Sequence, residues 1–216
     1  MSFRIGDSVI VKQGVKDPDF DADLSHWQGT IAERIDAKHV CIEWDSHTLE
    51  KMSHSQIKTC ERQGWSWHSI HLELSDIEKS SRRDTQEQVE KVIEKLEEQF
   101  FWAHLGAQGD RISTVLTGIS LDDEVGALKT WANYLNNTVT FPLPATVTEI
   151  QFTGPLQSGD LVTVHGIMEN YSQGLSVVVE SNANQYYFPL SDLEVHDKES
   201  ECFSPVEDYV IWFSNR

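Results

Sequence analysis

Cysteine is scarce in this chain, and its placement excludes two common ways of stabilising a small domain. The 216 residues contain three cysteines, Cys41, Cys60 and Cys202. An odd number without a Cys-x-x-Cys pair indicates neither a disulfide framework nor a zinc site. The histidines form no His-x-His or His-Glu-x-x-His motif, so transition-metal ligation is not indicated either. We therefore expect three free thiols.

Long apolar runs and catalytic motifs are also missing. No stretch of about 18 apolar residues occurs, and Met1 to Asp7 lacks the charged-then-apolar pattern of a secretory signal, so we expect a cytoplasmic protein. No Gly-x-Ser-x-Gly, phosphate-binding loop, Gly-x-Gly-x-x-Gly or nucleophile with a paired base is readable. The sequence therefore predicts a protein that is not an enzyme.

Positive charge is rare, above all near the C-terminus. The chain has 17 Lys and Arg against 35 Asp and Glu, a net charge of −18. Residues 141–216 hold 11 acidic and 2 basic residues, so half of that charge, −9, falls in the last third. Such a field repels nucleic acid and anionic membranes, and it attracts metal cations and basic proteins. A merely soluble acidic surface is the alternative.

Strand and turn signals are concentrated in two parts of the chain, which echo each other. Gly6-Asp7-Ser8-Val9 reads like Gly159-Asp160-Leu161-Val162, and Leu74-Ser75-Asp76 reads like Leu190-Ser191-Asp192. A Gly-Asp turn feeding short alternating strands is typical of small barrels. The sequence therefore predicts one small β-module that occurs twice, although two short matches can also be coincidence.

The predicted fold class is α+β, with two SH3-like or Tudor-like β-barrel modules separated by a helical segment. The N-terminal module is expected at residues 1–79, a polar linker at 80–83, the helical segment at 84–139 and the acidic C-terminal module at 140–216. Apolar alternation in Thr30 to Ile35 and His39 to Trp44 predicts a hairpin that turns near Asp36.

Helix signals fall between and within these modules. Ser53 and Gly64 are the expected caps of a short helix, and Asp84-Thr85-Gln86-Glu87 resembles a capping box that starts another. A further helix is predicted from Leu121 to Leu135, with Ser120 and Asp123 as its capping box.

Four carboxylates, Asp17, Asp19, Asp21 and Asp23, occur at every second residue around Pro18. Proline and clustered aspartates disfavour helix and sheet, so this segment is expected to be a loop. A spacing of two turns successive oxygens toward a hard cation, as in the EF-hand loop. The EF-hand pattern itself fails, because Ala22 stands where glycine is needed and Gln28 where glutamate is needed. A calcium loop and a solvated acidic turn both remain open.

The last third of the chain resembles a known family in four separate blocks. The blocks are Phe141-Pro142-Leu143 with Ala145, Val147 and Glu149; Gly159-Asp160 with Val162 and Val164; Phe188-Pro189-Leu190 with Asp192-Leu193-Glu194 and Asp197-Lys198; and Tyr209 to Arg216. Together they resemble the small acidic calcium-binding protein family known from cyanobacteria. Longer relatives also carry an N-terminal module with blocks similar to Asp17 to Phe20, Trp27 to Gly29 and Trp44 to Leu49.

The resemblance implies a cytoplasmic calcium binder, which in cyanobacteria is a buffer tied to the timing of cell differentiation. The chain departs from the family in two places. Pro144 and Thr146 stand where members often have acidic residues, which weakens a site near Glu149, and the often basic loop is Ser181 to Gln185 here.

The predicted function is therefore non-enzymatic calcium binding, as a buffer or a sensor, through loop carboxylates and backbone carbonyls. The predicted Ca²⁺ ligands are Asp17, Asp19, Asp21 and Asp23 in the N-terminal loop, and Glu149, Glu169, Asp192, Glu194, Asp197 and Glu199 in the C-terminal module. The alternative is an interaction module whose acidic face binds a basic protein. Trp65, Trp67, Tyr186 and Tyr187 are its candidate aromatic patch.

Overall fold

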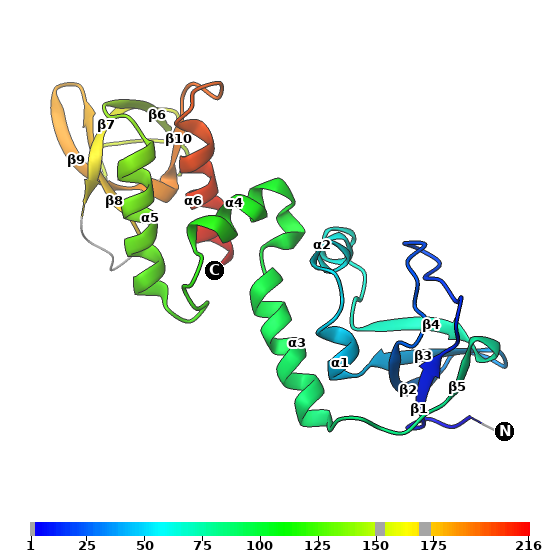
Figure 1. The fold of residues 1–216 in the computed structure, drawn as a ribbon. Helices are drawn as coiled ribbons and strands as arrows, with labels where there is room; N and C mark the ends of the chain where they lie inside the picture. The colour runs from blue at the N-terminus through cyan, green and yellow to red at the C-terminus, as the bar shows by residue number, and fades with distance from the viewer. Residues whose placement is uncertain (1–2, 150–153, 169–173) are drawn as a thin grey trace. The chain divides into compact units, whose positions relative to one another are not determined.

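The computed structural model describes residues 3–149, 154–168 and 174–216, and it divides the chain into two compact units (Figure 1). The units are Met1–Gly106 and Ala107–Arg216. Each contains a five-stranded antiparallel sheet together with helices, so the α+β class is confirmed. The predicted helical segment contributes helices to both units.

The sheet of the first unit has the strand order β4-β3-β2-β1-β5. Its strands are β1 (Ser8–Val11), β2 (Gln28–Arg34), β3 (His39–Trp44), β4 (Ser69–Glu73) and β5 (Ile77–Lys79). The predicted hairpin is confirmed as β2 and β3. At its turn the Asp36 carboxylate accepts hydrogen bonds from the backbone N–H groups of Lys38, at 2.6 Å, and His39, at 2.8 Å.

Local caps set the helices of the first unit. These helices are α1 (Ser46–Leu49), α2 (His54–Gln63), α3 (Gln86–Phe100) and the 3-10 turn η2 (Ala103–Leu105). The predicted caps of α2 are confirmed: Ser53 forms a capping box with Gln56, and Gly64 ends the helix in the left-handed conformation, which glycine adopts without strain. Thr85 and Gln88 form the box that starts α3. The apolar stripe of α3 then joins the core of the sheet.

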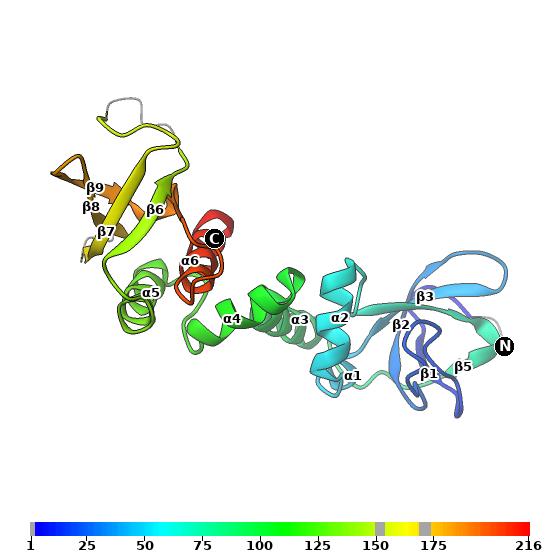
Figure 2. The same ribbon diagram turned by 90° about the horizontal axis from the view of Figure 1, so that it is seen from above.

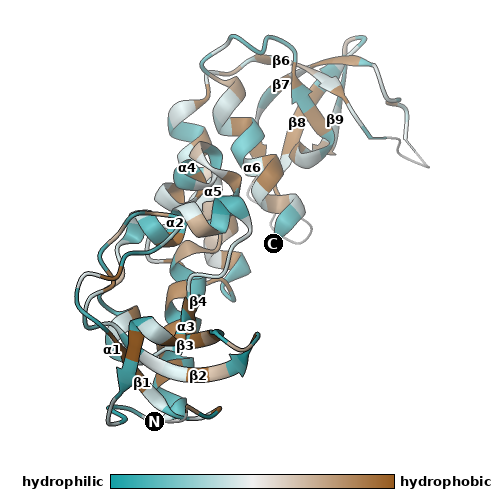
Figure 3. Cartoon of the chain, turned by 90° about the vertical axis from the view of Figure 1, so that its right-hand side faces the viewer, coloured by the Kyte–Doolittle hydropathy of each residue, from teal (hydrophilic) through white to brown (hydrophobic). Residues whose placement is uncertain are grey.

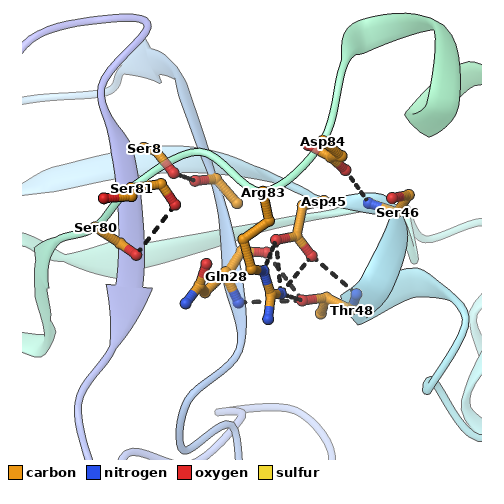
Figure 4. A network of polar contacts seen from close by, with 10 residues as sticks. Ser8, Gln28, Asp45, Ser46, Thr48, Ser80, Ser81, Arg83 and Asp84 are labelled. Carbon is orange, nitrogen blue, oxygen red and sulfur yellow. Dashed lines mark hydrogen bonds and ion pairs between the residues drawn. The ribbon is translucent and has the colours of Figure 1, made fainter.

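An ion pair between an arginine and a buried aspartate fastens the segment between β5 and α3 to the sheet of the first unit (Figure 4). Arg83 donates two hydrogen bonds of 2.8 Å to Asp45, one to each carboxylate oxygen. Asp45 also caps α1 by accepting from the Thr48 N–H at 2.8 Å, and Asp84 accepts from the Ser46 N–H at 2.6 Å. The predicted linker at 80–83 is therefore bonded to the sheet unit that precedes it.

The second unit has the strand order β10-β6-β7-β8-β9. Its elements are α4 (Ala107–Val115), α5 (Glu124–Thr138), β6 (Leu143–Val147), β7 (Leu161–Met168), β8 (Ser176–Ser181), β9 (Asn184–Pro189), η3 (Leu190–Asp192), β10 (Leu193–Val195) and α6 (Phe203–Asn215). The helix predicted from Leu121 is confirmed as α5, but it starts later, because the Asp123 side chain accepts from the Gly126 N–H and makes Asp123 the N-cap. The sequence did not predict α4 and α6.

Aromatic side chains form the contact between α5 and α6, which pack beside the sheet (Figures 1 and 2). Trp131 is fully buried, with ring centroids 5.8 Å from both Tyr209 and Trp212. The Tyr209 hydroxyl oxygen accepts from the Leu175 N–H at 2.7 Å, and burial raises the pKa of Tyr209 to about 12. In Figure 3, hydrophobic residues, drawn in brown, are visible on α6 and on β8. This packing ties β8 to the C-terminal helix.

The two sheets share one topology. Numbered within its own unit, each sheet runs fourth, third, second, first, fifth strand. The closing motifs are equivalent, since η1 (Leu74–Asp76) and η3 each join the fourth strand to the fifth. The opening motifs are not, because Gly6-Asp7 precedes the first strand and Gly159-Asp160 the second. No pairing among the described strands closes either sheet, so the closed barrel and the duplicated module stay predictions.

Candidate metal centre

The predicted N-terminal carboxylates lie in the turn between β1 and β2, and most of them already have local partners. One oxygen of Asp17 accepts from the backbone N–H groups of Asp19, at 2.8 Å, and Phe20, at 3.1 Å. Asp21 has a positive φ of 52° and pairs with Lys16 at 2.8 Å. Lys16 and Asp23 form an isolated β-bridge across the base of the turn.

Asp23 completes this turn with a contact to Ser25. Its carboxylate accepts from the Ser25 hydroxyl and, at 2.8 Å, from the Ser25 N–H. These two bonds lower the pKa of Asp23 below its ordinary value. These local hydrogen bonds and the ion pair with Lys16 are typical of a solvated acidic turn. The calcium loop stays a prediction.

In the second unit, the end of β6 meets the segment that leads into β10. The Thr148 N–H donates to the Asp192 carbonyl at 2.8 Å, one step beyond the paired residues Val147 and Leu193. Glu149, which follows Thr148, is therefore brought beside the Asp192 segment. The Ser191 hydroxyl donates to the Asp192 carboxylate at 2.9 Å. These two predicted ligands, distant in sequence, lie on adjoining segments.

The other predicted C-terminal ligands follow β10 or lie outside the described residues. Glu194 pairs with Lys198 at 2.6 Å, and this contact raises the pKa of Lys198. Asp197 accepts from the Glu199 N–H at 3.1 Å, as turn aspartates do. Glu169 is not among the residues that the structure describes. Among the described members of this group, only Glu194 lies on a strand next to β6.

The described carboxylates do not make a complete calcium shell by themselves. Within residues 3–149, 154–168 and 174–216, no three side chains of His, Cys, Asp or Glu gather closely enough to hold a metal. Calcium takes six to eight oxygens, and backbone carbonyls and waters contribute to many of its sites. Glu149, Asp192 and Glu194 are hard oxygen donors, a set that suits calcium better than a transition metal. Among the described residues they do not form a closed cage by themselves.

A buried acid that the sequence did not single out also lies in the second unit. Asp208, 1% exposed on α6, accepts from Arg111 Nε at 2.6 Å, from Arg111 Nη2 at 2.7 Å and from Gln108 Nε2 at 3.1 Å. Its oxygens are therefore already used in joining α4 to α6. The spacing of Val206, Tyr209 and Val210 was the available signal for this helix.

Known proteins match the same unit. Residues 110–213 match the model of a family described as calcium binding. This span falls within the second unit and includes α4 and α5 as well as the sheet. The resemblance is thus supported for the C-terminal part and extends to helices before residue 140.

Two solved structures are similar over about half of the chain. The crystal structure of the protein CcbP from Anabaena is 18% identical, covers 49% of this chain and 90% of its own, and gives a TM-score of 0.40. A calcium-binding protein in its calcium-binding form is 20% identical, covers 50% of this chain and 90% of its own, and gives 0.42. No curated protein matched the chain.

Two further observations concern possible partners. No helix in the described ranges has the length and apolar character needed to cross a bilayer. The predicted aromatic patch is divided between the units, since Trp65 and Trp67 belong to the first and Tyr186 and Tyr187 to β9 of the second.

Proposed function

We propose that this chain is a cytoplasmic, non-enzymatic calcium-binding protein, a buffer or sensor, whose second unit holds the ion. The match of residues 110–213 to a calcium-binding family carries the proposal, because it coincides with a compact unit. The charge of −9 on residues 141–216 supports it, since that field concentrates cations.

The proposed site is the junction of β6 with η3 and β10. Glu149 and Asp192 are its primary ligands, Glu194 on β10 is a further carboxylate, and backbone carbonyls of the same turns and waters complete the shell. Asp197, Glu199 and Glu169 are outer candidates. Because the described carboxylates form no cluster of three, we expect modest affinity. The Asp17 to Asp23 turn is a proposed second and weaker site.

Calorimetric titration of the full, chelator-treated chain with calcium tests this proposal. We expect at least one ion per chain, and at least tenfold weaker binding when Glu149→Gln and Asp192→Asn are combined. The matched control is Glu180→Gln, which removes a carboxylate of the same unit that pairs with His165 at 3.0 Å. It should bind calcium like the parent.

The possible outcomes test separately whether the chain binds calcium and where the ion binds. No binding at millimolar calcium would overturn the function. Unchanged binding by the double variant would leave the function standing and show that the junction is not the site. Loss of an ion by an Asp19→Asn and Asp21→Asn variant would then assign it to the N-terminal turn.

A further inference from the structure

The first unit contains a cavity of about 370 Å³ that the calcium proposal does not use. It lies between the turn after β1, helix α2, strand β4 and the segment at 65–67. Five aromatic side chains line it: Phe20, Trp27, Trp44, Trp65 and Trp67. Ligand pockets in proteins have this size and this mainly apolar lining, with few polar groups.

The aromatic rings are arranged as walls that face in different directions. Phe20 and Trp65 have centroids 6.0 Å apart and planes at 67°, and Trp27 and Trp44 have centroids 5.1 Å apart and planes at 77°. Trp67 is held by a 2.7 Å hydrogen bond from its indole Nε1 to Glu61. Trp44 and Trp67 are nearly fully buried, whereas Trp65 is 48% exposed. The cavity is thus a preformed box in which Trp44 and Trp67 are buried, Phe20 and Trp27 are half-buried, and Trp65 is the most accessible wall.

Negative charge accompanies these rings. Asp17 and Asp19 line the cavity, and no lysine or arginine does so among the described residues. One Asp17 oxygen holds the turn, but within the described part of the chain no residue donates to the Asp19 carboxylate. Cys60 lines the same cavity, and its pKa is raised to about 11, chiefly by burial and further by Asp17, Glu61 and Asp19. The field of these carboxylates therefore reaches the interior.

We propose that this cavity binds a weakly hydrated organic cation, a methylated ammonium or guanidinium group, carried on a side chain of a basic partner polypeptide. Aromatic faces attract such cations through their quadrupole, most strongly when the cation is desolvated. Carboxylates at the turn add charge complementarity. A calcium ion is a poorer occupant, because it needs six to eight oxygens and the walls are carbon.

The neighbouring strand indicates a polypeptide as the source of the cation. Ser69, Ile70 and His71 of β4 line the cavity, and β4 lies at the end of the strand order. Edge strands present backbone N–H and C=O groups to which an extended peptide can add as a further strand. Alternate side chains of that peptide would point to one face, so one of them can enter the box.

Binding of blocked amino acids to the full chain in the presence of chelator tests the chemistry. The probes are acetyl-trimethyllysine amide, acetyl-arginine amide and the neutral carbon isostere of trimethyllysine, followed by the indole N–H signals in NMR spectra. We expect at least one of the two cations to bind at least tenfold more tightly than the isostere. Equal binding of cation and isostere, or no binding of any probe, would overturn the proposal.

Variants locate the site. Trp65→Ala and Asp19→Asn should each weaken binding of the cation at least fivefold. The matched controls are Tyr187→Ala, an aromatic residue 75% exposed in the other unit, and Glu33→Gln, an exposed carboxylate on β2, and both should leave binding unchanged. Asp19→Asn keeps size and turn propensity, so it remains informative if Trp65→Ala unfolds. Unchanged binding by the folded variants would overturn the assignment to this cavity.

A final comparison tests the source. An extended hexapeptide carrying the same cation should bind at least tenfold more tightly than the blocked amino acid if β4 contributes. Equal affinities would overturn the polypeptide source and leave a free small cation as the ligand. Calcium that displaces the cation competitively, with loss of both in Asp19→Asn, would make the turn a metal site and overturn the proposal. Since the probes are bound under chelation, this proposal and the calcium proposal can fail separately.

Discussion

Asp208 and Asp192 lie in the same unit, yet their side chains have different surroundings. Asp208 is buried and accepts three hydrogen bonds from Arg111 and Gln108. Asp192 is partly exposed at the end of a sheet, beside a hydroxyl group. The first carboxylate joins α4 to α6, whereas the second is a proposed calcium ligand.

This difference predicts a large effect of Asp208 on stability. Asp208→Asn removes the charge that pairs with Arg111, so we expect the free energy of unfolding to fall by about 2 kcal/mol. Urea unfolding of the full chain, followed by tryptophan fluorescence, measures it. Glu207→Gln, on the same helix but exposed, should change stability by less than about 0.5 kcal/mol. A similar loss in both variants would show that the ion pair is not responsible.

At the scale of elements, signals contained within a few residues were readable. Ser53 was correctly expected to cap α2, and the capping-box pattern expected over Asp84 to Glu87 placed the start of α3 close to its observed cap, Thr85, because such signals need only a few residues. The hairpin of β2 and β3 was readable from alternation and turn chemistry. By contrast, α4 contains Gly109 and polar residues, and its contact with α6 runs through Arg111. Such a helix depends on tertiary contacts that no local pattern contains.

In the candidate site, too, local features could be predicted from the sequence, whereas contacts between distant segments could not. The sequence identified Glu149 and Asp192 as carboxylates, but their segments adjoin because β6 pairs with β10. That pairing joins residues far apart in the chain, and the sequence of neither strand indicates which strand it pairs with. The turn at Asp17 to Asp23 is local, and it was correctly expected to be a loop. Its own hydrogen bonds to Lys16 and Ser25, which compete with a metal, were not predicted.

The turn of the first hairpin gives a pH prediction. The Lys38 N–H, and then His39, lower the pKa of Asp36 to about 2 from an ordinary value of 3.8. A lowered pKa means that the ionised carboxylate stabilises the fold above pH 4 and that this contribution is lost as pH falls through about 2. We expect Asp36→Ala to lower the melting temperature at pH 7, with a smaller difference from the parent at pH 2.5.

Carboxyl carbon shifts in an NMR titration check the assignment directly, because Asp36 should titrate near pH 2. The control is Glu33→Ala, whose side chain is exposed on the preceding strand. A difference between parent and Asp36→Ala that is the same at both pH values would contradict the prediction.

At the scale of the whole molecule, the fragment 107–216 should fold without the first unit. Its core contains Trp131 of α5 packed on Tyr209 and Trp212 of α6. A fragment that starts at residue 140 lacks Trp131 and Leu135, which are fully buried, and so leaves the aromatic face of α6 uncovered. We expect a cooperative thermal transition from the longer fragment only, with a midpoint that rises with calcium.

Circular dichroism of both fragments, with and without millimolar calcium, makes the measurement. A cooperative transition in the fragment 140–216 would show that α5 is dispensable. Indifference of the longer fragment to calcium, alongside a calcium response of the full chain, would move the ion to the first unit.

The ion pair between Arg83 and Asp45 determines where a gene segment that encodes a complete first unit can end. A gene segment ending at Lys79 would encode the whole first sheet, yet it would leave Asp45 buried without its cation and the core without Val89, Leu96 and Phe100. Recombination at that point would transfer a first unit that lacks part of its core. The transferable piece reaches the end of η2, so exchange between genes favours a junction near Gly106.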